Sequence, residues 1–254
     1  MYRLDQLADS DRLTILFSPD GRIIQVEYAR KAMARGSPSI GVRFSDGVVL
    51  VGRRKMDVLV LPNKKIFAVD DHLGATFSGY SADGRALINY ARERAQVYRF
   101  IYNEGVDLRL LAQEVSSLMH TYTQFGGARP FGCGVIFGGV DTTGPQLVYI
   151  DPGGATMEWL AGAIGMNKEK AEEYLKEVFK DSGRDIDFEG AMVAALTALF
   201  IASEEKFGGV EVEVGYVRGN GRFVIRTGED EEIKSFVEEA YKKFDEWKKK
   251  LESE

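Results

Sequence analysis

The stretch DRLTILFSPDGRIIQVEYARKAMARG, residues 11–36, runs directly into SPSIGVRFSDGVVLVGRR, residues 37–54, and decides how the rest of the chain is interpreted. Within it, SPDG at 18–21 has the composition of a tight turn, because proline presets φ and glycine tolerates the exit conformation. From Ile23 the apolar residues recur on roughly one helical face, and Gly36 is a typical helix stop. The pattern predicts a turn, an amphipathic helix and then a strand.

Hydropathy patterns in the rest of the chain predict strands and helices that arrive in pairs. Strand candidates at 40–44 and 48–52 are separated by Ser-Asp-Gly, a strong hairpin signal. Valines that alternate with Glu211 and Glu213 predict a half-exposed strand at 210–216. Such strand pairs with paired helices suit antiparallel sheets covered by helical layers, not βαβ units. The other expected strands are 66–70, 74–78, 134–140, 147–150, 156–161 and 222–226, and the expected helices are about 87–101, 108–122, 168–179, 188–206 and 229–251.

Composition narrows the class of protein. With 254 residues and no linker, low-complexity stretch or repeat, the chain is expected to form one domain over 1–254. A net charge of −6 disfavours an extended nucleic-acid site. The single Cys133 excludes an intrachain disulfide and fits a reducing compartment. The N-terminus has no apolar core for a signal peptide, and no run is long enough to span a bilayer. We therefore expect a cytoplasmic protein without nucleic-acid or membrane partners.

Residues that often carry chemistry give only weak signals here. Cys133 lies in a strand pattern, where a buried inert thiol is favoured over a nucleophile paired with His72 or His120. The two histidines lack metal-ligand spacing, and the glycine pairs lack the spacing of a phosphate-binding loop. We expect neither a metal nor a cofactor.

Several sequence blocks carry a resemblance to a known family. SPDGRIIQVEYA at 18–29 resembles the N-terminal signature of α-type subunits of the 20S proteasome, the archaeal kind in particular. The resemblance implies an α+β fold, the four-layer αββα sandwich of the N-terminal nucleophile hydrolases, with two antiparallel sheets face to face and helices outside both. Similar blocks recur in order over nearly the whole chain, at 39–55, 63–88, 122–139 and 151–165.

Catalytic β-type relatives use a processed N-terminal threonine with a lysine and an acidic residue, and the resemblance places Ser37, Lys65 and Arg53 at these three positions. Ser37 is internal, so it lacks the free amine that this chemistry needs. Arg53 carries a positive charge at the position where catalytic relatives have an acid. Two cations about 4 Å apart, such as Arg53 and Lys65, repel by about 4 kcal/mol at an intermediate dielectric constant. Arg53 is therefore expected to point elsewhere. The main hypothesis is a chain without catalytic residues. The rivals are an amidohydrolase that cuts itself before Ser37 and a free-standing binding protein of the same fold.

The resemblance implies an architectural role in a seven-membered α ring that caps the catalytic β rings and gates substrate entry. The gate segment and ring-contact helix would span 1–36, and Asp11, Pro19 and Tyr28 match three positions of the family's open-gate cluster. Ser10 stands where the family has tyrosine. The alternative for Tyr28 is simple helix packing.

Two further sites follow from the resemblance. Lys65 and Gly36 match a pocket that receives the C-terminal carboxylate of a regulatory ATPase or other activator, although 56–63 is shorter than usual, and Lys65 as an ordinary surface lysine is the alternative. The loop 124–130 matches the constriction through which unfolded protein substrates pass, and a tucked loop aromatic is the alternative for its phenylalanine. Its expected residues are Phe125, Gly126, Gly127 and Arg129. The charged helix within 229–254 is expected to keep the ring soluble rather than to bind a partner.

Overall fold

The computed structural model describes residues 17–56, 58–59, 61–181 and 185–253. Ten strands in this part of the chain form two five-stranded antiparallel sheets. The first sheet has the order β10-β9-β2-β1-β8 and the second has the order β3-β4-β5-β6-β7. The strands of the first sheet are β1 (Ser39–Phe44), β2 (Gly47–Arg53), β8 (Ala161–Ile164), β9 (Val212–Arg218) and β10 (Val224–Thr227). Those of the second are β3 (Ile66–Asp70), β4 (Leu73–Gly79), β5 (Cys133–Asp141), β6 (Gly144–Ile150) and β7 (Thr156–Glu158).

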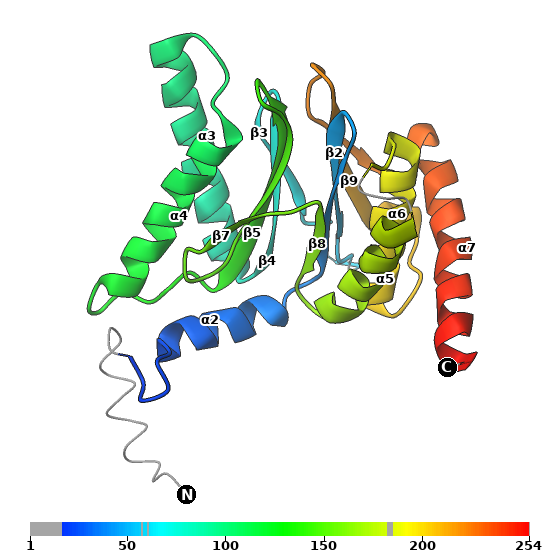
Figure 1. Ribbon diagram of the computed structural model, residues 1–254, viewed down its shortest axis with the longest axis horizontal. Helices are drawn as coiled ribbons and strands as arrows, with labels where there is room; N and C mark the ends of the chain where they lie inside the picture. The colour runs from blue at the N-terminus through cyan, green and yellow to red at the C-terminus, as the bar shows by residue number, and fades with distance from the viewer. Residues whose placement is uncertain (1–16, 57, 60, 182–184, 254) are drawn as a thin grey trace, which may run out of the picture.

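Helices cover the outer face of each sheet, which confirms the expected αββα sandwich (Figure 1). One pair, α3 (Ser81–Tyr102) and α4 (Leu108–Gln124), lies outside the second sheet. A second pair, α5 (Lys168–Asp181) and α6 (Phe188–Ser203), lies outside the first sheet, with α7 (Glu231–Ser253) on its outer side. The remaining helix, α2 (Ile24–Ala34), crosses the end of the sandwich where β1 begins.

Apolar side chains fill the space between the layers. The middle cluster lies between the two sheets and includes Val48 and Leu50 of β2 with Ile136 of β5. Because β2 is covered by helices on one face and by the second sheet on the other, its run is apolar without alternation. Helix α6 is likewise apolar on every side because it lies between the first sheet and α7. These buried segments form the rigid frame on which the candidate site is built.

The structure corrects three of the predicted elements. The single strand expected at 156–161 is two strands, β7 and β8, which belong to different sheets. The chain crosses between the sheets at Trp159, whose ring stacks on Tyr149 with centroids 4.5 Å apart. Helix α6 ends at Ser203 rather than 206, because Glu204 adopts a left-handed conformation with φ 58°.

The third correction concerns β9. The expected half-exposed strand at 210–216 starts instead at Val212, after a 3₁₀ turn, η1 (Gly209–Glu211), and it is buried from Val212 to Val217. Glu213 is only 4% exposed. Its carboxylate accepts backbone hydrogen bonds from Lys65 at 2.5 Å and Ile66 at 2.8 Å, which replace the water that burial removes. An acidic residue in an alternating pattern is therefore not a sign of exposure here.

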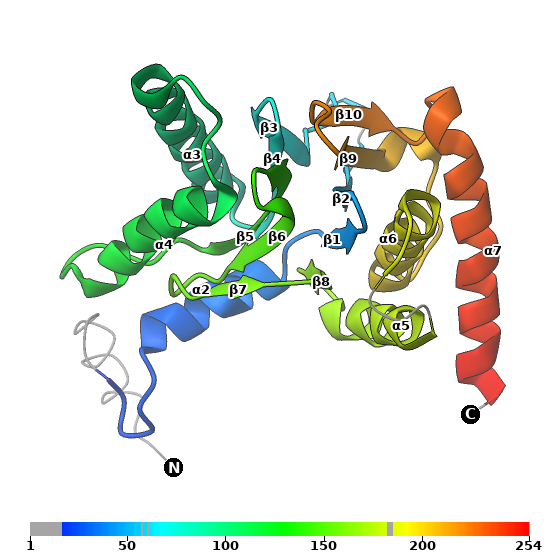
Figure 2. The ribbon, with the colours of Figure 1, turned by 45° about the horizontal axis from the view of Figure 1, so that its top comes forward.

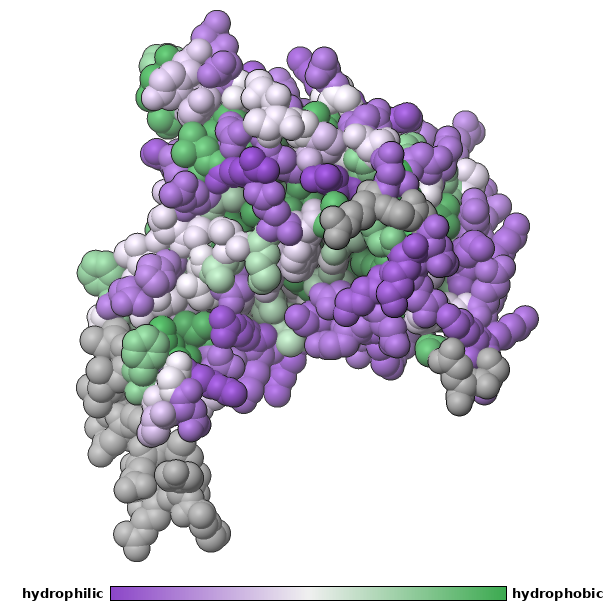
Figure 3. Space-filling view, in the orientation of Figure 1, coloured by the Kyte–Doolittle hydropathy of each residue, from purple (hydrophilic) through white to green (hydrophobic). Residues whose placement is uncertain are grey.

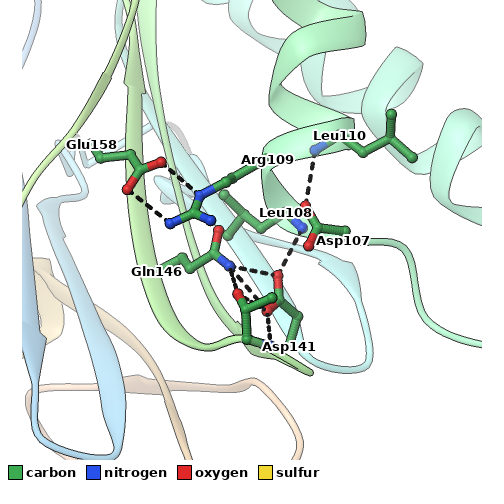
Figure 4. A network of polar contacts seen from close by, with 8 residues as sticks. Asp107, Leu108, Arg109, Leu110, Asp141, Gln146 and Glu158 are labelled. Carbon is green, nitrogen blue, oxygen red and sulfur yellow. Dashed lines mark hydrogen bonds and ion pairs between the residues drawn. The ribbon is translucent and has the colours of Figure 1, made fainter.

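A polar network fixes α4 to the second sheet (Figure 4). Asp107 caps the helix by accepting a hydrogen bond from the Leu110 amide at 3.1 Å. Asp141, at the end of β5, accepts another from the Leu108 amide at 3.0 Å. The guanidinium of Arg109 donates to Glu158 at the end of β7, with 2.6 Å for the shorter bond. The contacts hold the start of α4 against β5 and β7.

The surface over α5 and α7 is mostly hydrophilic in the space-filling view (Figure 3). This distribution agrees with a charged last helix that faces solvent, as the sequence predicts. Within the described ranges, no helix is both long enough and apolar enough to cross a membrane.

Candidate functional site

Lys65 is buried directly before β3, beside Ser37, which lies two residues before β1. Its ammonium donates hydrogen bonds to the backbone carbonyls of Ser37 at 2.9 Å and Phe77 at 2.6 Å. The residue is 8% exposed, so the alternative of an ordinary surface lysine is wrong. Burial lowers the pKa of Lys65 from its ordinary value to about 7. The site therefore holds an amine whose charge depends on nearby groups and on pH.

Ser37 lies close to Lys65, but its hydroxyl is not paired with the amine. The Ser37 hydroxyl donates to the backbone carbonyl of Arg53 at 3.3 Å, whereas Lys65 contacts the carbonyl of Ser37. The nitrogen of Ser37 is a peptide nitrogen joined to Gly36, so it is not a free amine. A nucleophile needs a base within hydrogen-bond reach of its hydroxyl, and this arrangement does not place Lys65 there.

Arg53 points away from Lys65, as its charge predicts. Its guanidinium lies 4.3 Å from the centroid of the Phe207 ring. The same group forms ion pairs with Glu211, at 3.3 Å, and with Glu205. These contacts draw the cation toward the segment before β9. The position that holds an acid in catalytic relatives thus contributes neither a negative charge nor a proton acceptor to Ser37 and Lys65.

Gly36 packs tightly between α2 and β4. A Cβ atom at this position would lie 2.2 Å from the backbone nitrogen of Gly79 and 2.3 Å from the Ser78 hydroxyl, so only glycine fits without movement. The carbonyl of Gly36 accepts a hydrogen bond from the Met166 amide at 2.9 Å. Gly36 and Lys65 are expected to share one pocket. Gly36 precedes Ser37 in the chain, and the Lys65 ammonium contacts the Ser37 carbonyl, so both residues lie next to Ser37.

The predicted gate residues are only partly described. Ser10 and Asp11 lie outside the described residues. Pro19 lies in the predicted turn, which is closed by a hydrogen bond from the Gly21 amide to the Ser18 carbonyl at 2.8 Å. Tyr28, in contrast, does not share the buried face of α2, where the buried side chains are Val26, Ala29 and Met33.

Tyr28 is 46% exposed, so it is only partly packed within the chain, and simple helix packing stays an alternative to a gating role. Its ring lies 5.6 Å from the Lys31 ammonium. The side chain borders a hollow of about 380 Å³ that α2 forms with Tyr80 and Pro130. The hollow connects the predicted gate helix with the predicted constriction loop.

The constriction loop presents its aromatic residue to solvent. Phe125 is 64% exposed, so the alternative of a tucked aromatic is wrong. Gly126 and Gly127 have open space where a side chain would stand, but Gly127 has φ +86°, which favours glycine. Arg129 points back into the chain and forms a bidentate pair with Asp83, at 2.6 and 2.9 Å. Of the four predicted residues, Arg129 therefore anchors the loop, and Phe125 and the glycines form its free part.

Asp83 is the partner of Arg129 that sequence reasoning missed. It lies near the start of α3 and also accepts a hydrogen bond from the Gly132 amide at 2.8 Å. Burial acts to raise the pKa of Asp83, but Arg129 and the Gly132 amide outweigh it and lower that pKa. Acidic residues are common in the first turn of helices, so the position of Asp83 in the sequence does not indicate that it binds the distant Arg129.

Arg30 and Asp151 are a second missed pair. The Arg30 guanidinium donates to the Asp151 carboxylate at 2.6 and 2.8 Å, which ties α2 to the loop after β6. Asp151 also accepts hydrogen bonds from the amides of Gly153 and Ala155, both at 2.9 Å. The helix that carries the predicted gate residues is thus held against the second sheet by a charged contact.

The remaining candidates for chemistry are inert or separate. Cys133 is fully buried, and burial raises the pKa of its thiol to about 12, which agrees with an inert thiol. The ring of His72 contacts the Val106 carbonyl at 2.9 Å and lies 3.6 Å from Asp70. Among the residues that the structure describes, no three His, Cys, Asp or Glu side chains are grouped so that they would hold a metal ion.

Comparison with known proteins gives consistent matches along the chain. The sequence pattern of the family described as "Proteasome subunit" matches residues 33–217, and the N-terminal signature of A-type proteasome subunits matches residues 11–32. The chain is 38% identical over 243 residues to the proteasome alpha subunit of Archaeoglobus fulgidus, covering 94% of this chain and 97% of that protein. It is 41% identical over 237 residues to the proteasome alpha subunit of Methanothermobacter thermautotrophicus, covering 92% and 94%. It is 40% identical over 231 residues to the proteasome alpha 1 subunit of Haloferax volcanii, covering 90% of each.

Proposed function

The chain belongs to the proteasome subunit family, as an α-type member, and on that premise we propose that it forms an outer ring that admits substrates to catalytic β rings without supplying a nucleophile itself. The observation that carries the proposal is the arrangement around Ser37. The α-type signature at 11–32 leads through α2 into an internal Ser37. The Lys65 ammonium contacts backbone carbonyls, and Arg53 points away.

The arrangement favours this role over the self-processing rival. For Ser37 to act, the Gly36–Ser37 bond must be cut and Lys65 must turn from the Ser37 carbonyl to the new terminus. Arg53 cannot take the role that the acid has in catalytic relatives, because Arg53 is a cation whose contacts lead toward Glu211 and Phe207. Proper geometry of nucleophile, base and orienting group is the requirement that the rival does not meet.

Gating is the second part of the proposal. The gate is assigned to the N-terminal end of α2, which carries the exposed Tyr28 and the turn at Pro19, with Ser10 and Asp11 as their proposed partners. The exposed Phe125 and the two glycines beside it are proposed to form the constriction. Support comes from the hollow that Tyr28 borders together with Pro130, since it brings both elements to one end of the molecule.

Docking of an activator is the third part. We assign to Lys65 the C-terminal carboxylate of a regulatory ATPase or similar ring, with Gly36 beside it. A carboxylate that reaches the ammonium forms a charge-assisted hydrogen bond worth roughly 1.5–3 kcal/mol, and several tails per ring multiply the effect. Since burial lowers the pKa of Lys65 to about 7, such binding takes up a proton above that pH and weakens as the pH rises.

Replacement of the lysine tests the docking site. In assembled particles, Lys65→Ala is expected to abolish stimulation by an activator whose tail ends in a free carboxylate. Lys242→Ala is the control, because Lys242 of α7 is an exposed lysine away from Lys65. Full stimulation of the Lys65→Ala particle would remove the assignment and leave the ring proposal intact.

Native mass spectrometry of the purified full-length chain tests the main proposal. We expect seven-membered rings of chains with intact mass, and peptide hydrolysis only after β subunits are added. Ser37→Ala should leave both results unchanged. Loss of residues 1–36 or hydrolysis by the chain alone would establish the rival enzyme, and a stable monomer would establish a free-standing binding protein.

The proposal also includes the domain organisation, the partners and the compartment of the protein. The chain is proposed to act as one domain over 1–254, with other α subunits, β subunits, an activator ring and unfolded substrates as partners. The cytoplasm is the proposed compartment, because the single thiol is free and buried, and free thiols are typical of reducing compartments.

A further inference from the structure

The link between β2 and β3 exposes large apolar side chains to solvent. Val58 is 101% exposed, Leu61 88% and Met56 41%. We name these three residues the apolar link. Soluble surfaces rarely gather large apolar side chains in so short a segment unless a partner covers them. The link is therefore a candidate interaction surface.

The two ends of the apolar link are basic and firmly attached. Lys55 and Lys64 are exposed on either side of it. Before the link, the Arg54 amide donates to the Glu211 carbonyl at 2.7 Å, and its guanidinium donates to the Val210 carbonyl at 2.6 Å. After it, the Lys65 amide is held by Glu213. The apolar side chains thus project from a fixed base on the β9 side of the first sheet.

An apolar hollow of about 300 Å³ lies at the β8 edge of the same sheet. It is lined by Trp159, Leu160 and Ala161 at the crossing from β7 to β8, and by Leu175 and Phe179 of α5. An apolar cavity of about 150 Å³ holds a benzene-sized group, so this hollow has room for two aliphatic side chains. We name these five residues the apolar hollow.

The hollow is built into the fold rather than formed by mobile side chains. The Trp159 ring stacks on Tyr149, and the Trp159 amide donates to the Leu147 carbonyl at 2.8 Å. Just before it, Glu158 pairs with Arg109 of α4 (Figure 4). A preorganised surface loses less conformational entropy on binding, which favours a specific partner.

The rim of the hollow carries a carboxylate that suits the basic ends of the link. Glu172 lines the hollow together with Lys176. Burial raises the pKa of Glu172, whereas the nearby Lys168 and Lys176 act to lower it, and within the described ranges none of the ion pairs includes its carboxylate. A lysine from another molecule would add a counter-charge at closer range. The link and the hollow are therefore complementary in both polarity and charge.

The link and the hollow face in different directions, so one chain cannot satisfy both by itself. The link leaves the end of β2 and is anchored to the segment before β9, whereas the hollow lies beside the edge strand β8, and β1 lies between β2 and β8. Figure 2 shows this arrangement, with β9 and β10 above β1 and β2, and with β8 and α5 below them. A copy that inserts its link into the hollow of a neighbour leaves its own hollow open for a third copy. Such head-to-tail contacts produce a ring when the rotation closes.

We infer that the apolar link of one copy inserts into the apolar hollow of the next copy, with Lys55 or Lys64 opposite Glu172, as a contact between adjacent subunits of the α ring. The inference rests on the proposed ring, and it adds the residues that hold neighbours together. Leu61 and Val58 are the side chains that enter the hollow.

Cross-linking between copies tests the inference. Leu61→Cys and Lys176→Cys are introduced together in the full chain, where Cys133 is fully buried, and a short bismaleimide is added to assembled particles. We expect a ladder of covalent multimers that extends to the whole ring. The matched control is Phe100→Cys with Lys176→Cys, because Phe100 at the end of α3 is also apolar and 92% exposed. The control is expected to give no ladder.

Substitution supplies an independent measurement. Leu61→Asp is expected to raise the apparent dissociation constant between neighbouring chains about 10- to 100-fold, which corresponds to the burial of one leucine side chain. Phe100→Asp should leave it unchanged. Circular dichroism of the separated chains shows whether each variant is folded. We expect both variants to fold, because both positions are exposed.

Three outcomes would overturn the inference. Intact rings without the 61–176 ladder, or with an equal ladder in the control, would refute this contact and leave the proposed function standing. A cross-link from position 176 to a β subunit would assign the hollow to that partner instead. Failure of the unmodified chain to form rings, alone or with β subunits, would refute the proposed function together with the contact.

Discussion

Replacing the buried Lys65 with methionine is expected to change how stability depends on pH. Methionine keeps an unbranched apolar stem and removes the amine. The substitution leaves the carbonyl of Ser37 without the donor that lies 2.9 Å away, whereas the carbonyl of Phe77 keeps the Ser39 hydroxyl at 3.1 Å. An unsatisfied buried carbonyl costs about 1–3 kcal/mol, and this cost does not vary with pH.

The pH-dependent part follows from the pKa of Lys65. Burial lowers that pKa from 10.5 to about 7 in the folded chain. Between these two values the unfolded chain binds the proton and the folded chain releases it, so the free energy of unfolding rises with pH. The slope approaches about 1.36 kcal/mol per pH unit, which gives about 2 kcal/mol between about pH 7.5 and 9. The methionine variant lacks this contribution.

Urea denaturation followed by tryptophan fluorescence measures the difference. Wild type and Lys65→Met are compared at equal chain concentration from about pH 7.5 to 9, so that assembly contributes equally. Lys242→Met is the control, because Lys242 of α7 is exposed and should follow the wild type. Parallel pH profiles of wild type and Lys65→Met would show that Lys65 stays charged in the folded chain and that burial does not lower its pKa.

Three further substitutions have expected outcomes. Ser10→Tyr, which restores the family's gate residue, should raise peptide hydrolysis by assembled particles, and unchanged rates would count against a role of this position in gating. Asp83→Asn should weaken the bidentate contact with Arg129. Limited proteolysis in the loop 124–130 should then be several-fold faster than in the surface control Glu93→Gln. Equal cleavage rates would contradict the anchoring role. Gly74→Ala should lower the free energy of unfolding, measured by thermal or urea denaturation, by about 1–3 kcal/mol. The reason is that the new Cβ would lie 1.9 Å from the Phe223 ring. A stability equal to wild type would show that the ring moves freely.

Sequence patterns predicted the layers of the fold better than its edges. The hairpin of β1 and β2 and the helix pairs are confirmed, because their signals are local and repeated along the chain. The four-layer sandwich, which the family resemblance implied, is confirmed as well. The crossing at Trp159 was missed, since a short turn between sheets leaves the apolar pattern of 156–161 unbroken. The burial of Glu213 was also missed, because the amides that bind its carboxylate come from residues far away in sequence.

The candidate site shows the same division. The internal position of Ser37 and the reversed charge at Arg53 were evident from the sequence, and the matched relatives confirm the family that these residues indicated. The exposure of Tyr28 and Phe125 was not, because helical spacing does not tell which apolar residues lack a neighbour. The anchoring of Arg129 by Asp83 depends on a contact across 46 residues.

The sequence by itself determined the family, the order of the elements and the internal position of Ser37, because each depends on residue identity and short spacing. Only the tertiary structure decided that Lys65 is buried against two carbonyls, and that the apolar link follows the central strand β2 while the apolar hollow lies at the β8 edge of the same sheet. The physical reason is that burial and direction are properties of the packed layers. Segments distant in sequence create them together, and no local pattern contains them.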